Sequence, residues 1–173
     1  MRRWLPSAAA LVAASLFVVV GPVPAAQAVG QCEPNSFSTD FQPPLVATPR
    51  NTAMTDVTIV GSACTTTNPV ITSMLMEGSG TGLLSCAGSS TAHGNGAFRW
   101  TTLLGTTLHS GAEWTVDKAS VAGADVWTFT GSFTSGEFSG QGFRFVAVTG
   151  TNPLECAAAG VEKVNGPGVF AIL

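Results

Sequence analysis

The sequence predicts an all-β protein, a single β-sandwich or small barrel of about eight antiparallel strands. Three observations carry this prediction. Apolar and polar residues alternate with a period of two in several segments, and glycine-containing turn sequences separate these segments. No window shows the 3.6-residue period of an amphipathic helix, so we expect almost no helix beyond one turn at residues 157–159.

The first 28 residues have the pattern of a secretory signal peptide. Two arginines follow Met1, residues 8–20 form an apolar run, and Ala26 and Ala28 supply the small residues of a cleavage site. The run is too short to cross a bilayer, which needs ~20 apolar residues. We therefore expect cleavage after Ala28, or alternatively near Ala26, and a secreted, extracellular mature protein with no membrane attachment.

The charge balance of the chain restricts its partners. The sequence has 7 Lys and Arg residues against 10 Asp and Glu, and two of the basic residues lie in the predicted leader. The mature domain is therefore mildly acidic and has no basic run. Such a surface does not attract a phosphate backbone or an anionic membrane, so neither nucleic acid nor a membrane is an expected partner.

Residues 29–52 are predicted to form an extended Pro-rich arm that precedes a β-sandwich domain of residues 53–173. The segment contains four prolines, and proline is disfavoured in helices and in central strands. Phe37 and Phe41 in this arm need burial, either against the domain or against a partner. Both are therefore candidates for partner binding.

The domain is predicted to consist of short strands cut by glycine. Trp100, Trp127, Phe129, Phe143 and Phe145 each alternate with polar or small neighbours, which predicts that they form the core. We expect strands at residues 56–63, 70–77, 81–86, 97–104, 106–116, 125–133, 142–149 and 161–172. We expect turns at residues 78–80, 94–96, 105, 123, 135–136, 152–153 and 165–167.

All four cysteines lie after the predicted leader, and an even number in an exported protein predicts two disulfides. Three pairings of Cys32, Cys64, Cys86 and Cys156 are possible. We favour Cys32 with Cys64, which would tie the arm to the first strand, and Cys86 with Cys156, which would link distant strands. The spacings contain no close pair of the kind that binds zinc.

A search of the sequence for catalytic and metal-binding patterns finds none that predicts an enzyme. The two histidines are isolated: His93 precedes a Gly-Asn-Gly sequence, and His109 lies in a predicted strand four residues before Glu113. On a strand that spacing corresponds to ~13 Å, which is too far for one metal ion. We expect no catalytic residue, no metal and no cofactor.

Trp114 lies between Glu113 and Thr115 in a predicted strand. It is the aromatic side chain that is easiest to place on the surface, although the core is the position that we favour for it. We therefore add Trp114 to the partner-binding candidates.

Three stretches resemble a group of small secreted β-proteins common in actinobacteria. They are Gly78–Cys86 (GSGTGLLSC), Gly131–Gly140 (GSFTSGEFSG) and Thr151–Cys156 (TNPLEC). The chain is also similar in size and architecture to the adaptor subunits of umbrella-shaped antibacterial toxin particles. This resemblance implies a scaffold that joins other secreted proteins, and it carries over no catalytic residue.

The sequence therefore predicts a secreted, non-enzymatic protein-interaction module whose partner is another secreted protein, such as a subunit of an extracellular toxin complex. The arm could add a strand to the sheet of that partner. One alternative is a carrier of a small apolar ligand, which would need a cleft lined by Trp and Phe. Another alternative is a protease inhibitor, which would need an exposed, disulfide-braced loop.

Overall fold

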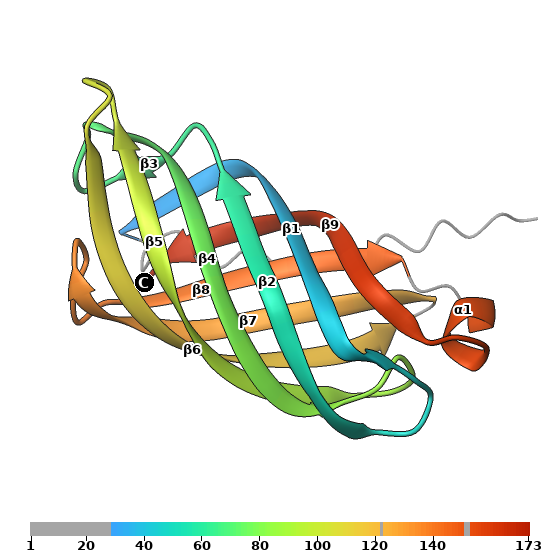
Figure 1. Cartoon of the computed structure of the whole chain (residues 1–173). Coiled ribbons are helices and arrows are strands. Elements are labelled where there is room, and N and C mark those ends of the chain that lie inside the picture. The colour runs from blue at the N-terminus through green and yellow to red at the C-terminus, as the bar shows by residue number, and fades with distance from the viewer. Residues whose placement is uncertain (1–28, 122, 151–152) are drawn as a thin grey trace, which may run out of the picture.

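The expected strands pair into one closed antiparallel sheet in the computed structural model, which describes residues 29–121, 123–150 and 153–173 (Figure 1). The barrel wall consists of eight long strands, which confirms the predicted all-β class and decides between the two architectures in favour of the barrel. They are β1 (Gly30–Leu45), β2 (Arg50–Gly61), β4 (Ile71–Leu84), β5 (Ser90–Thr102), β6 (Thr107–Val121), β7 (Ala124–Gly136), β8 (Gly142–Gly150) and β9 (Val161–Ile172).

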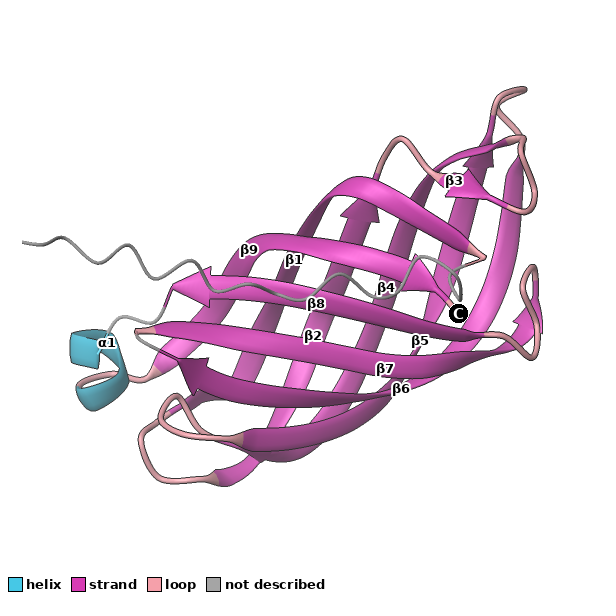
Figure 2. Ribbon diagram, turned by 180° about the vertical axis from the view of Figure 1, so that it is seen from behind, coloured by secondary structure: helices cyan, strands magenta, loops and turns pink. Residues whose placement is uncertain are grey.

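The connections are short, and from β4 to β9 each strand pairs with the next strand along the chain. Strand β1 pairs with both β9 and β2, and β2 pairs with β4, so the sheet closes on itself. A two-residue strand, β3 (Thr65–Thr66), pairs with the start of β1. The described helix is α1 (Pro153–Ala157), one short segment between β8 and β9 at one end of the barrel (Figure 2).

The prediction that residues 29–52 form an arm in front of a separate domain is wrong. Residues 30–45 are strand β1, an integral part of the wall, and β2 already begins at Arg50. The prolines are accommodated because the β1–β9 register shifts at their positions, between Cys32 and Asn35 and between Asp40 and Leu45. Such bulges remove the ladder hydrogen bonds that proline cannot make.

Two predicted glycine turns are also wrong, because residues 78–80 and 94–96 lie inside long strands. Gly78 pairs with Gly96, and Gly80 pairs with Gly94, in the continuous β4–β5 ladder. A Cβ atom on Gly94 would lie 2.4 Å from the Trp114 ring and 2.2 Å from the carbonyl oxygen of Ser79. Glycine is needed here because the bent wall brings backbone and a ring close together.

Residues 165–167 were likewise expected to form a turn but lie within β9. Pro167 is opposite Ser36 of β1 in this ladder. The turns expected at Gly105 and Gly123 are present, with φ angles of 75° and 84°.

Aromatic side chains fill the interior of the barrel. The five predicted core residues are all completely buried, which confirms that prediction. Their rings contact one another and further rings from other strands; for example, Phe98 stacks on Trp100 at 5.3 Å and meets Phe143 edge to face at 5.3 Å. Edge-to-face and offset contacts of this kind add stability beyond that of apolar burial alone.

The two disulfides have the favoured pairing, Cys32 with Cys64 and Cys86 with Cys156. They lie at opposite ends of the barrel. We call the end that contains loops 62–70, 103–106 and 137–141 the tip end, and the Cys32–Cys64 bridge closes it. The other end contains loops 46–49 and 85–89 together with α1, and the Cys86–Cys156 bridge joins loop 85–89 to that helix; we call it the helix end.

The predicted signal peptide, residues 1–28, lies outside the described residues. Among the residues that are described, no helix has the length and apolar character needed to cross a bilayer.

Candidate functional site

The three predicted partner-binding residues do not lie on the surface. Phe37 and Phe41 are 1% and 5% exposed and contact the ring of Trp127 from inside the barrel. Trp114 is 3% exposed and meets Phe129 edge to face at 5.2 Å. All three take the other position that was considered for them, burial within the domain, and they are wrong as surface contacts. The reason is that a strand in a closed barrel turns alternate side chains inward, and all three point that way.

The closed wall also rules out strand addition, the mode of binding that was expected for residues 29–52. Strand addition requires a sheet edge with unpaired backbone groups. Strand β1 has a neighbour on each side, β9 and β2, along most of its length. Contact with a partner must therefore come from the outer wall or from the loops at the two ends.

Three exposed apolar side chains form a small cluster at the tip end, while another strongly exposed leucine, Leu154 at 80%, lies in α1 at the helix end. Leu103 and Leu104 are 71% and 86% exposed, and Val70 on the neighbouring loop is 40% exposed. We call these three residues the leucine tip. It projects beyond the rest of the barrel at the β5–β6 connection, at the upper left of Figure 1.

The turn that carries the two leucines is well defined. The Gly105 amide donates to the Thr102 carbonyl at 2.9 Å, and the Thr102 amide donates to the Thr106 carbonyl at 2.9 Å. Gly105 takes a φ of 75°, which glycine adopts without strain. The Leu103 amide donates to the carbonyl of Val70 at 2.7 Å, so the turn is fixed against loop 62–70.

Leucine is unusual at the centre of such a turn. Gly, Pro, Asn, Asp and Ser favour these positions because their backbone preferences or side-chain hydrogen bonds stabilise the turn. Leu103 and Leu104 do neither, and they expose apolar surface to water. The sequence does contain a signal for this site, the neutral run Thr-Thr-Leu-Leu-Gly-Thr-Thr, but period-two analysis assigns both leucines to the end of a strand.

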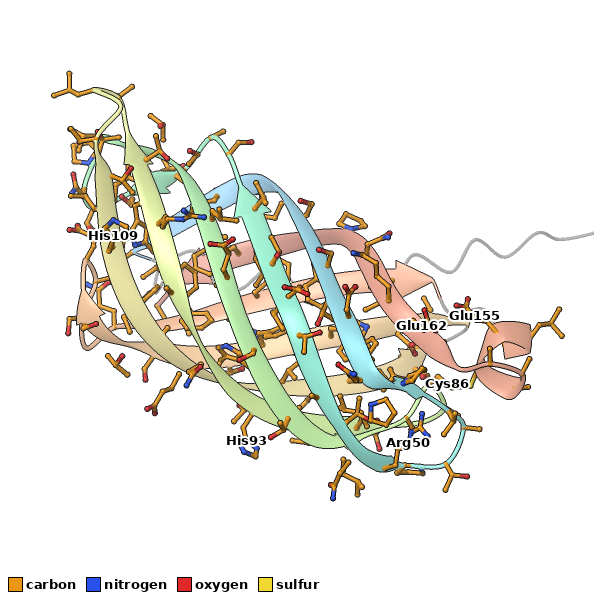
Figure 3. The ribbon with its side chains drawn as sticks, viewed as in Figure 1. Arg50, Cys86, His93, His109, Glu155 and Glu162 are labelled. Atoms are coloured by element: carbon orange, nitrogen blue, oxygen red, sulfur yellow. A yellow bond between two sulfur atoms is a disulfide. The ribbon has the colours of Figure 1, made fainter. Side chains whose placement is uncertain are left out.

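The outer wall has shallow hollows over strands β2 to β7. One, of about 520 Å³, has His93, Asn95 and Glu113 in its lining, and two others, of about 440 and 410 Å³, adjoin it and share His93. His93 lies in β5, next to residues 94–96, where a turn was expected. Figure 3 shows both histidines on the outside of the barrel, His93 at the lower edge of the view and His109 near the tip end.

The outer wall brings no metal-binding group together in the described part of the chain. No cluster of three or more His, Cys, Asp or Glu side chains with suitable spacing occurs there. His109 and Glu113 point to the same outer face of β6, as expected from the strand period.

A buried ion pair near the helix end could not be recognised from the sequence. Lys118 Nζ lies 3.1 Å from Asp125 Oδ1, and their side chains are 0% and 4% exposed. Ser120 donates to the same carboxylate oxygen at 2.5 Å, and Lys118 also lies 5.9 Å from the centre of the Trp127 ring. The pair bridges β6 and β7 inside the barrel, so its role is structural.

Comparisons of the chain with protein-family models, with curated proteins and with solved structures found no match.

Proposed function

We propose that this protein is a secreted, non-enzymatic protein-interaction module that binds another secreted protein through the leucine tip. The observation that carries this proposal is the exposure of Leu103 and Leu104 at the centre of a fixed turn. Apolar side chains on a rigid turn are unfavourable in water, and their burial by a partner lowers the free energy of the complex.

The leucine tip suits an apolar pocket. Full burial of one leucine side chain contributes ~1.5–3 kcal/mol, so covering Leu103 and Leu104 contributes ~3–6 kcal/mol before the costs of association. The turn is already ordered by its hydrogen bonds, so little conformational entropy is lost on binding. A convex pair of leucines therefore fits a concave apolar site.

The charge of the tip end favours a protein over a membrane. Loops 62–70, 103–106 and 137–141 contain one charged residue, Glu137. Peripheral membrane anchors usually combine apolar residues with Lys or Arg that attract anionic lipids. The tip end has no such residue, and two leucines alone provide a weak anchor.

The resemblance noted above supports a more specific form of the proposal, an adaptor in an extracellular antibacterial toxin complex. An adaptor needs at least two binding surfaces. The barrel offers two ends that are far apart, each held by its own disulfide. The leucine tip would serve one partner, which leaves the helix end or the outer wall for another.

The two alternatives receive less support. A carrier needs a cleft lined by Trp and Phe, and these rings pack against each other in the interior. A substrate-like protease inhibitor presents an extended loop, whereas Leu103 and Leu104 sit in a tight turn closed by the Gly105 to Thr102 hydrogen bond.

Affinity capture with a matched pair of variants tests the proposal. The mature protein, the tip variant Leu103→Ser/Leu104→Ser and the control Val148→Ser/Val169→Ser are each immobilised and incubated with culture supernatant of the producing organism. Val148 and Val169 are exposed valines of the outer wall, at 38% and 50%. We expect one identified protein to be retained by the wild type and the control and lost by the tip variant.

Three results would overturn the proposal. The tip variant could retain every protein that the wild type retains, or the wild type could retain no protein. The third result is that the wild type sediments with phosphatidylcholine vesicles and the tip variant does not, because the leucine tip would then bind lipid.

A further inference from the structure

A buried amine and a buried carboxyl group are held in contact inside the barrel, near the helix end. In the β6–β7 ladder Lys118 lies opposite Trp127, and Ser120 lies opposite Asp125. The Lys118 side chain therefore reaches along its strand to Asp125, where Nζ lies 3.1 Å from Oδ1. The two side chains are 0% and 4% exposed, so bulk water does not reach the contact.

A second ion pair provides a comparison within the same molecule. Lys163 Nζ also lies 3.1 Å from a carboxylate oxygen, Oδ1 of Asp40, but these two side chains are 57% and 40% exposed. Water solvates both charges of this pair. The distance is the same in the two pairs, and burial is the difference between them.

Burial makes the charged form of the interior pair unfavourable. An ion that leaves water loses its hydration, and attraction to its partner repays this loss only when further hydrogen bonds satisfy both groups. The ammonium of Lys118 has three N–H groups, and within the described chain it donates to two oxygen atoms, Ser120 Oγ at 3.2 Å and Asp125 Oδ1. A reaction that turns the two charges into one neutral group therefore lowers the free energy of the interior.

Ser120 connects the two groups and provides a path for a proton. Its hydroxyl accepts a hydrogen bond from Lys118 Nζ and donates one to Asp125 Oδ1 at 2.5 Å. A proton can pass along these bonds from the ammonium to the carboxylate, which leaves an amine beside a carboxylic acid. Ser120 itself is exposed. A water molecule that forms at the pair can therefore leave past this residue.

We propose that Lys118 and Asp125 form an intramolecular amide bond. The lone pair of the Lys118 amine attacks the carboxyl carbon of Asp125, a C–N bond forms and the C–OH bond breaks. The hydroxyl group leaves with a proton from the nitrogen as one water molecule, so the reaction consumes no oxidant and no cofactor. Groups held in a reactive orientation have effective concentrations of up to ~10⁵–10⁸ M, and the product replaces two buried charges by a neutral amide.

The ion pair described above is the precursor of this bond. The cross-link joins β6 to β7 near the end of the barrel that also contains the Cys86–Cys156 bridge. Two covalent links would then hold the helix end. The bond is independent of the leucine tip, which lies at the other end of the barrel.

Tryptic peptide mapping by mass spectrometry tests the proposal, because trypsin cleaves after Lys and Arg. Lys118 is the one Lys or Arg between Arg99 and Arg144. Without the amide bond, trypsin releases residues 100–118 and 119–144 as separate peptides. With the bond, Lys118 is not recognised, and we expect one peptide of residues 100–144 that is lighter by one water molecule. Cleavage after Lys163 should remain complete, since the exposed pair does not react.

Three variants sharpen the test. Lys118→Arg keeps the positive charge but cannot form the amide, so its intact mass should stay at the value of its sequence after reduction of the disulfides. Lys163→Arg is the matched control and should lose one water molecule as the wild type does. Ser120→Ala should slow the loss of water at least ~10-fold, measured on freshly purified protein that is kept at neutral pH.

The proposal is overturned if the wild type keeps its full mass on prolonged incubation and trypsin still cleaves after Lys118. It is also overturned if Lys118→Arg loses water, or if Lys163 is cross-linked to the same extent as Lys118, because burial would then not be the cause. An unchanged rate in Ser120→Ala would overturn the role of its hydroxyl. Capture by the leucine tip is measured separately, so either proposal can fail without the other.

Discussion

The inner and outer faces of the barrel wall are built from the same strands but carry different side chains. The inner face is a continuous set of Phe and Trp rings that contact one another, with one buried ion pair near the helix end. The outer face carries mostly polar side chains, and the tip end holds exposed leucines. The difference indicates that the interior provides stability, and the surface that we propose for recognition lies on the outside.

The strongest test of this contrast is the loss of an interior ring. Trp127 is completely buried, stacks on Phe41 and donates to Thr149. Trp127→Ala should reduce the free energy of unfolding by ~3–5 kcal/mol, because it leaves a cavity and an unsatisfied hydroxyl. Urea unfolding followed by circular dichroism measures this loss. A change below ~1 kcal/mol, which is typical of surface sites, would mean that the interior is not close-packed.

Removal of one partner of the buried ion pair should have a comparable effect. Lys118→Met leaves Asp125 as an uncompensated charge inside the barrel, and such changes cost ~3–5 kcal/mol. The double variant Lys118→Met/Asp125→Leu removes both charges and should recover most of the loss. If the single and double variants unfold at the same urea concentration, the Asp125 carboxylate does not destabilise the barrel when Lys118 is absent, and the two residues are not coupled.

The disulfides should contribute somewhat less, and unequally. The Cys86–Cys156 bridge closes a separation of 70 residues and the Cys32–Cys64 bridge one of 32. Replacing either pair with serine should cost ~2–4 kcal/mol, and the longer loop should cost about 0.7 kcal/mol more in the loop-entropy account. Thermal unfolding of the two double variants compares them. A larger effect at Cys32–Cys64 would show that native-state contacts at the tip end outweigh loop entropy.

The sequence predicts the inner face better than the outer one, and the reason is physical. Trp100, Phe129 and Phe145 alternate with polar neighbours, and this period determines which way a strand side chain points. The favoured pairing of the cysteines is also confirmed, although the segment that the first bridge was expected to tie down is strand β1 and not an arm. Burial of apolar side chains dominates the stability of the fold, so the residues that are buried can be recognised from the alternation in the sequence.

The sequence left the choice between a sandwich and a closed barrel open, because closure depends on exceptions to local rules. Prolines in β1 predict a loop, but register shifts at those positions keep the strand in the wall. Gly80 and Gly94 predict turns, but they are needed where the wall bends over Trp114. The leucine tip was missed for the same reason, since Leu103 and Leu104 occupy turn positions that local preference assigns to polar residues.

The smallest predicted change in stability belongs to the leucine tip. Leu103→Ser/Leu104→Ser removes no interior contact and should change the free energy of unfolding by less than ~0.5 kcal/mol. The same variant should lose the captured partner. Loss of binding without loss of stability would show that the outside of the barrel serves recognition and the interior serves folding.

The most direct test of the account is therefore the capture of a partner by this tip variant, measured on protein whose unfolding free energy has first been shown to equal that of the wild type. We predict that an identified secreted protein binds the wild type and the Val148→Ser/Val169→Ser control and does not bind the tip variant. Equal capture by all three proteins would contradict the account.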